Sequence, residues 1–129
     1  RLDGVPKTLP ALVRSQRLQQ KASYAGFDWD KVEHVWDKVH EEIQELKEAQ
    51  SADTKAHMEE EIGDVLFAVV NLARFLEIPA EDALRKANQK FTDRFALVEQ
   101  ELQRRGKSVE DSSLKEMDKI WNEVKHGTN

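Results

Sequence analysis

The segment from Thr54 to about Leu76 is predicted to be a helix that stops before Pro79, and from Ile62 onward it is a nearly continuous apolar stretch. When this stretch is placed on a helix it has almost no polar face, because its apolar members are Ile62, Val65, Leu66, Phe67, Ala68, Val69, Val70, Leu72, Ala73, Phe75 and Leu76. A helix that is apolar on every side is normally buried. Other helices must therefore cover this one, which favours a helical bundle.

Four further segments have the length and the apolar spacing of helices, and short polar or glycine-containing breaks separate them. We expect these helices over residues 10–24, about 30–50, 80–105 and about 113–127. Charged residues make up 35% of the chain, and it contains only five Gly and three Pro. That composition is typical of long amphipathic helices. The sequence therefore predicts an all-α fold, a bundle of about five helices.

Length and composition limit the class of protein. The 129 residues suit a single domain over 1–129, with 1–7 as a linker. The net charge of −5 argues against non-specific nucleic-acid binding. The absence of cysteine fits a reducing cytoplasm, and no apolar run reaches the roughly 20 residues of a membrane span. Because the chain opens with Arg1, we expect a fragment or a processed form.

The second predicted helix carries an acidic flank. Its core stripe consists of Val32, Val35, Trp36, Val39, Ile43 and Leu46. At about 100° per residue, Lys38, Glu42 and Glu45 fall together beside that stripe, whereas Glu41 and Glu48 point further toward solvent. Taken alone, such a flank is usually a solvated edge.

Glu61 and Asp64 change that interpretation, because they lie one turn apart on the apolar third helix. A buried carboxylate is costly unless it is paired or binds a metal. Gly63 lies between them and lowers helix stability, which a close approach of another helix would explain. The structural alternative is that Glu61 simply pairs with a lysine near the helix end.

If the second and third helices pack antiparallel, Glu42 and Glu45 face Glu61 and Asp64. Four clustered carboxylates repel one another unless a cation lies between them. An all-oxygen site suits Mg²⁺ or Mn²⁺ rather than zinc, and Mg²⁺ commonly binds substrate phosphates. A ferritin-like di-iron site would need two inward Glu-x-x-His motifs, and the sequence has only the terminal one that begins at Glu123.

Polyanionic substrates also need cations beside the metal. Lys90 and Arg94 lie one turn apart on the fourth predicted helix, and Trp121 and Lys125 do so on the fifth. A Trp can stack on a base, and a Lys can contact a phosphate. Each pair has an ordinary alternative, since such cations are usually solvated and a Trp in a stripe is usually core.

Glu41-Glu42-Ile43-Gln44-Glu45, followed by Glu61-Ile62-Gly63-Asp64, matches the EExxE…ExxD signature of the MazG family. This family is a branch of the all-α NTP pyrophosphatase superfamily. Flanking sequence segments such as Gly26-Phe27-Asp28-Trp29 are also similar to those of the family, so that the resemblance covers nearly the whole chain. It is closest to the C-terminal half of the long, two-domain form.

The resemblance implies a helical bundle that forms a homodimer, and a site in which water attacks the α-phosphorus of an NTP and pyrophosphate leaves. The implied ligands of Mg²⁺, for which Mn²⁺ can substitute, are Glu42, Glu45, Glu61 and Asp64. The implied phosphate contacts are Lys38, Lys90 and Arg94. Trp121 and Lys125 resemble the base and sugar side of the family pocket. Broad use of NTPs and dNTPs in nucleotide-pool cleansing follows from the same resemblance.

Two other functions stay open from the sequence. One is a narrower pyrophosphatase of the same superfamily that prefers dCTP or dUTP. The other is a non-catalytic helical interaction module that has kept the scaffold. A substrate panel distinguishes the first alternative, and a metal titration distinguishes the second.

Overall fold

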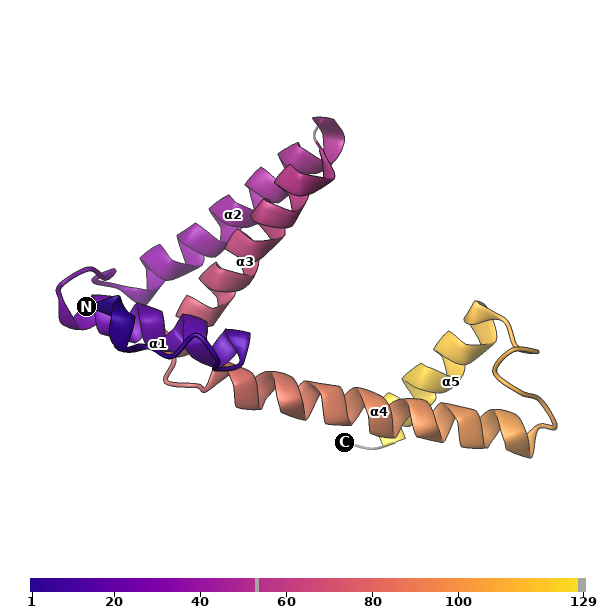
Figure 1. Cartoon of the computed structure of the whole chain (residues 1–129). Helices are drawn as coiled ribbons and strands as arrows, with labels where there is room; N and C mark the ends of the chain where they lie inside the picture. Colours follow the sequence, from indigo (N-terminus) through magenta and orange to yellow (C-terminus); the bar gives the residue numbers. More distant parts are fainter. Residues whose placement is uncertain (53, 128–129) are drawn as a thin grey trace. The chain divides into compact units, whose positions relative to one another are not determined.

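The computed structural model describes residues 1–52 and 54–127, and no strand occurs among them. A short 3-10 helix, η1, spans Leu2–Gly4 at the start of the chain. The five α-helices are α1 (Ala11–Tyr24), α2 (Val32–Ala52), α3 (Lys55–Phe75), α4 (Ala80–Arg104) and α5 (Leu114–Gly127) (Figure 1). The predicted all-α fold is confirmed, and the predicted helix ends agree to within a few residues.

The chain divides into two compact units, Arg1–Ala83 and the part from Leu84 onward. The first unit contains η1, α1, α2 and α3. Within the segment predicted to be a linker, η1 is helical and the side chain of Val5 is buried. In the described part of the chain, no helix combines the length and the apolar character needed to cross a membrane.

The core of the first unit lies between α2 and α3, which run side by side in Figure 1. Its buried members are Val35, Val39, Ala68 and Leu72, and Val32, Ile43 and Phe75 pack against them. Only residues 53 and 54 separate the two helices, and the Thr54 Oγ1 atom accepts a hydrogen bond from the backbone N–H of His57 at 3.3 Å. Such a cap satisfies one of the N–H groups that a helix start leaves free.

Within the single chain, only part of the apolar surface of α3 is buried. Ala68, Val70 and Leu72 are buried, but Leu66 is 54% exposed, and Ile62, Phe67 and Val69 are also exposed. The physical reason is that α1 and α2 are the helices that pack on α3, and two neighbours cover only part of its circumference. The close helix approach expected at Gly63 is also absent among the described residues, since an added Cβ would meet no atom within 4 Å.

The second unit has a smaller core formed by α4 and α5. Val98, Leu102 and Ile120 are buried there, and Trp121 packs against them. Helix α4 ends at Arg104, one residue before the predicted Arg105, and the predicted stop residue Gly106 has a φ of 75°, in the left-handed region that glycine adopts without strain. The Ser113 Oγ atom accepts the backbone N–H of Glu116 at 3.1 Å, which caps α5.

Candidate metal centre

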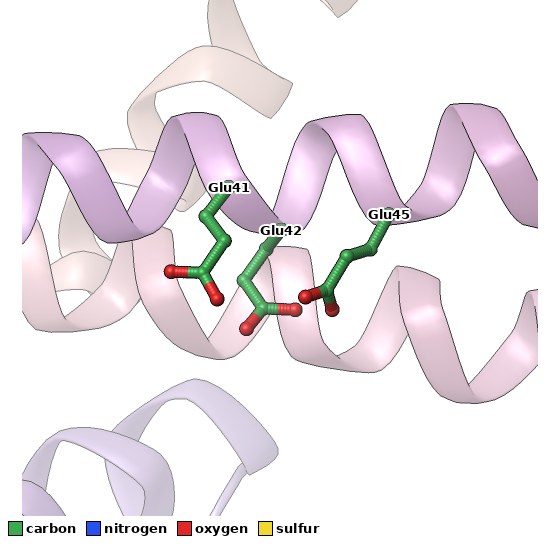
Figure 2. A group of neighbouring side chains, drawn as sticks. All are labelled: Glu41, Glu42 and Glu45. Carbon is green, nitrogen blue, oxygen red and sulfur yellow. The ribbon is translucent and has the colours of Figure 1, made fainter.

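Three glutamates of α2 gather their carboxylates on one side of the helix, as Figure 2 shows. Glu41, Glu42 and Glu45 each offer one oxygen, and these oxygens lie within 4.8 Å of one another. Glu41 is exposed to solvent, as predicted, but its carboxylate also joins this group, which was not expected. Its flexible side chain turns back along the helix toward Lys38, and its place as the first glutamate of the EExxE pattern was the signal for it.

A second acidic group spans both helices of the pair. Glu42 of α2 and Glu61 and Asp64 of α3 each offer an oxygen, again within 4.8 Å of one another. Glu42 therefore belongs to both groups. The two groups together contain the four carboxylates that the sequence singled out, and Glu42 joins Glu45 in one group and Glu61 and Asp64 in the other.

Burial leaves two of these carboxylate oxygens without a partner. Glu42 is only 6% exposed, and its Oε2 atom has no hydrogen-bond partner among the residues described. The Oε2 atom of Glu61 is likewise buried and unpartnered. A buried anionic oxygen without a donor is unfavourable unless a cation compensates it. The all-oxygen donor set and the two orphaned atoms fit a hard divalent cation such as Mg²⁺ or Mn²⁺.

The electrostatics of the group show the crowding of negative charge. The negative charge of Glu42, followed by burial and the charge of Glu61, raises the pKa of Glu45. Lys38 neutralises part of this charge, because its Nζ atom lies 2.9 Å from Glu42 Oε1 and 3.5 Å from Glu41 Oε1. The hydrogen bond to Glu42 is the main reason why the pKa of Lys38 is raised. A single lysine leaves the group with excess negative charge.

His57 is a site neighbour that the sequence reasoning missed. Its Nε2 atom lies 3.0 Å from Glu61 Oε1, one helical turn away. The partner expected in the structural alternative was a lysine, and the structure has this histidine instead. The i, i+4 spacing near the start of α3 was the available signal. The contact accounts for one oxygen of Glu61 and leaves Oε2 orphaned.

The remaining predicted substrate contacts belong to the second unit. The Arg94 guanidinium carbon lies 5.9 Å from the centroid of the Trp121 ring, and Phe91 lies 5.3 Å from it. An apolar cavity of about 270 Å³ adjoins Trp121 and Phe91. Lys90 and Lys125 are exposed on α4 and α5. The structure therefore groups Arg94 with Trp121 in one unit, and groups Lys38 with the carboxylates in the other.

The chain is similar in sequence to known proteins over most of its length. Residues 30–98, which contain all four carboxylates, match the MazG nucleotide pyrophosphohydrolase domain. The chain is 46% identical over 126 residues to a nucleoside triphosphate pyrophosphohydrolase of Escherichia coli strain K12, covering 96% of this chain and 48% of that protein. It is 41% identical over 127 residues to a nucleoside triphosphate pyrophosphohydrolase/pyrophosphatase MazG of Thermotoga maritima, covering 98% of this chain and 49% of that protein.

A third relative is an uncharacterized protein, YabN, of Bacillus subtilis. It is 47% identical over 125 residues, covering 96% of this chain and 26% of that protein. The chain thus spans about half or less of the length of the curated relatives that it matches.

Proposed function

This chain belongs to the MazG nucleotide pyrophosphohydrolase family, and from that premise we propose that it hydrolyses nucleoside triphosphates to nucleoside monophosphates and pyrophosphate with Mg²⁺. The observation that carries the proposal is the pair of acidic groups that share Glu42, with two buried oxygens, Glu42 Oε2 and Glu61 Oε2, that have no hydrogen-bond partner among the described residues. Mg²⁺ sites commonly combine a few carboxylates with substrate phosphates. The relatives' printed names supply the reaction class.

In this proposal Glu42, Glu45, Glu61 and Asp64 hold the cation, and Mn²⁺ can replace Mg²⁺. The bound ion supplies positive charge that offsets the phosphate oxygens. A water oxygen forms the new bond to the α-phosphorus, and the bond to the bridging oxygen breaks. Pyrophosphate leaves with that electron pair, and a carboxylate of the group accepts the proton of the water.

The proposed phosphate contacts are Lys38, Lys90 and Arg94. Lys38 is already ordered by its contacts with Glu42 and Glu41, so that its ammonium group lies beside the acidic group. Fixed cations of this kind offset the charge that develops on a leaving pyrophosphate. Trp121 and Lys125 are the proposed contacts on the sugar and base side, and the approach of Arg94 to the Trp121 ring supports their joint use.

The decisive experiment is chromatography of ATP digests made with Mg²⁺. We expect AMP and pyrophosphate as the products. ADP and orthophosphate would contradict the proposed attack at the α-phosphorus. A panel of NTPs and dNTPs, read through added inorganic pyrophosphatase, tests the proposed broad specificity. Strong preference for dCTP or dUTP would instead support the narrower enzyme, and metal binding without turnover would support a non-catalytic module.

We also propose that the chain acts as a homodimer in the cytoplasm, on the nucleotide pool. The support for the dimer is the exposed apolar face of α3, which contains Ile62, Leu66, Phe67 and Val69. An apolar face of this kind is costly in water, and a two-fold pairing lets each copy cover the same face of the other.

A further inference from the structure

Two carboxylates of the candidate metal centre share a pattern of contacts that the proposed reaction does not use. Glu42 Oε1 accepts from Lys38 Nζ at 2.9 Å, and Glu61 Oε1 lies 3.0 Å from His57 Nε2. The second oxygen of each carboxylate, Oε2, is buried and has no partner among the described residues. In both residues, one oxygen is therefore bonded inside the protein and the other is left for a ligand.

The nitrogen partner occupies the same position relative to the carboxylate in both helices. Lys38 precedes Glu42 by four residues on α2, and His57 precedes Glu61 by four residues on α3. Side chains at this spacing lie one above the other on one face of a helix. Each helix thus holds its own nitrogen group beside its own carboxylate.

The bond between His57 and Glu61 has one direction. An ionised carboxylate has no proton and can only accept, so that the imidazole Nε2 atom donates. The imidazole is also planar and turns about only two side-chain bonds. Holding it in place therefore costs less conformational entropy than holding a lysine would.

The His57 ring is suited to orienting a carboxylate without supporting the core. Its side chain is 42% exposed, whereas the side chain of Glu61 is only 12% exposed. The bond between Thr54 Oγ1 and the N–H of His57 involves the backbone of His57 and not its ring. Replacing the ring should therefore leave both the core and the cap of α3 in place.

Fixing one oxygen of a carboxylate decides which oxygen stays available. The last torsion of a glutamate side chain is broad, so that an unrestrained carboxylate exchanges its two oxygens easily. A hydrogen bond to one oxygen removes this freedom before a cation arrives. In metal sites generally, partners that orient a ligand in this way contribute about 10- to 100-fold to metal affinity.

We propose that His57 is a positioning residue of the candidate metal centre, and that its bond to Glu61 Oε1 holds the carboxylate so that Oε2 stays available to the cation. The inference rests on the proposed function for the role of Glu61 as a metal ligand. Lys38 holds Glu42 in a similar way, but Lys38 is also a proposed phosphate contact, so that its replacement would mix two effects. His57 has no assigned contact with the substrate, and its replacement therefore isolates the effect of positioning.

The test measures Mn²⁺ binding in the absence of nucleotide, through the electron paramagnetic resonance signal of the free ion. His57→Leu should weaken Mn²⁺ binding about tenfold, because the Glu61 carboxylate loses its fixed orientation. His57→Gln should restore most of the affinity, since the glutamine side chain again offers an N–H donor. Native affinity in His57→Leu would overturn the proposal, and so would equally weak binding by the Leu and Gln variants.

His34→Leu is the matched control. The His34 Nδ1 atom lies 2.8 Å from Asp30 Oδ1, so that this pair has the same spacing of four residues. Neither residue belongs to the two acidic groups. The variant should therefore keep the native affinity for Mn²⁺. A comparable loss in His34→Leu would show that removing either histidine disturbs the protein, and it would overturn the assignment to His57.

A double-mutant cycle tests whether His57 acts through Glu61. In Glu61→Ala the carboxylate that His57 orients is absent. Adding His57→Leu to that variant should therefore weaken Mn²⁺ binding no further. Additive losses in the double variant would show that His57 acts on the cation by another route, and they would overturn the positioning role.

Thermal unfolding of the metal-free protein distinguishes positioning from an ordinary structural role. We expect His57→Leu to unfold close to the native temperature without metal, because the ring is largely exposed. The stabilisation that added Mn²⁺ provides should be smaller in His57→Leu than in the native chain. A metal-free unfolding temperature that falls in step with the Mn²⁺ affinity would overturn the positioning role.

ATP hydrolysis is measured separately, so that failure of the proposed function is distinguishable from failure of this inference. If the native chain binds Mn²⁺ but hydrolyses no triphosphate, the proposed function is wrong, and the binding comparison still decides the role of His57. If His57→Leu raises only the KM for ATP and keeps the native affinity for Mn²⁺, this inference alone is overturned. That result would indicate a direct contact between His57 and the substrate.

Discussion

At the scale of single residues, Glu42 is the side chain on which the candidate metal centre depends. It is a member of both acidic groups and is buried, whereas Glu45 and Asp64 are more accessible to solvent. A cation bound by these groups would therefore contact Glu42 in either arrangement. Replacing Glu42 should therefore weaken cation binding more than replacing an exposed ligand.

The first prediction concerns the four carboxylates. Glu42→Gln, Glu45→Gln, Glu61→Gln and Asp64→Asn should each lower turnover about 100-fold or more, since even indirect partners of metal ligands contribute 10- to 100-fold. Without Mg²⁺, thermal stability should hold or rise, because one repelling charge is removed. Pyrophosphate release and circular dichroism measure the two effects.

Glu48→Gln is the control on the same helix, because Glu48 is an exposed residue of α2 whose carboxylate accepts from Gln44. This variant should keep native turnover. A carboxylate variant that reaches near-native rates at saturating Mg²⁺ would remove its residue from the proposed site.

The second prediction concerns Glu101 in α4. A hydrogen bond from Arg104, helped by one from Arg105, lowers the pKa of Glu101 from its ordinary 4.5 to about 2. Because the pKa is depressed in the folded state, the ionised carboxylate stabilises the fold above pH 4.5, and this contribution is lost as the pH falls toward 2. Carboxyl chemical shifts from NMR should give a midpoint well below 4.5 for Glu101.

Glu101→Gln should therefore be less stable than the native chain at pH 6, with the difference closing near pH 2. The pair is exposed, so that the loss will be small and will shrink further in high salt. A midpoint near 4.5 for Glu101 would show that the arginines do not hold the carboxylate in solution.

At the scale of helices, the third prediction concerns the start of α3. Thr54→Ala removes the side-chain acceptor for the backbone N–H of His57 and should cost about 1 kcal/mol of unfolding free energy. Thr92→Ala is the matched control, since Thr92 lies inside α4 and bonds its hydroxyl to Asn88 O. Alanine favours a helix interior, so that this control should be neutral or slightly stabilising. Urea unfolding measures both, and equal effects would contradict the cap.

The helices themselves were predictable, because glycine, proline and short polar breaks separate amphipathic runs. Which side of α3 is covered was not. In an amphipathic helix such as α2 the apolar stripe identifies the buried face. Val35 and Val39 were assigned to the core correctly, but Trp36 of the same stripe was not, since it is 45% exposed. In α3 nearly every position is apolar, so that periodicity gives no direction and Leu66 could not be told from Ala68.

The placement of the carboxylates on each helix was also predictable. Spacing alone placed Glu61 and Asp64 on one side of α3 and Glu42 and Glu45 on one side of α2. The contact between α1 and α3 at Gln19 was not predictable, because the Gln19 Nε2 atom donates to the Phe67 carbonyl oxygen, 48 residues away in the sequence. Backbone acceptors leave no pattern in side-chain identity.

At the scale of the whole molecule, the fourth prediction concerns assembly. Size-exclusion chromatography with light scattering at micromolar concentration should give a dimer or a larger species. Leu66→Glu places a charge within the exposed apolar face of α3 and should shift the protein toward monomer. A native chain that is monomeric and fully active would contradict both the dimer and the argument from the apolar face.

A mixing experiment tests whether a dimer shares its sites. Glu61→Gln chains and Lys90→Ala chains should each be weakly active alone. If Lys90 of one chain serves the carboxylates of the other, mixed dimers should regain activity. If mixing restores nothing, each site uses residues of one chain, and the dimer has a structural role only.

The hairpin of α2 and α3 has a consequence for how the protein forms. Its candidate ligands come from helices that are neighbours along the chain, with only residues 53 and 54 between them. Bringing them together requires the closure of one short loop, which costs little chain entropy and belongs to the fast class of folding events. All four carboxylates also precede residue 65 in the order of synthesis. The acidic group can therefore assemble on a growing chain once α3 has left the ribosome, before α4 and α5 have emerged from it.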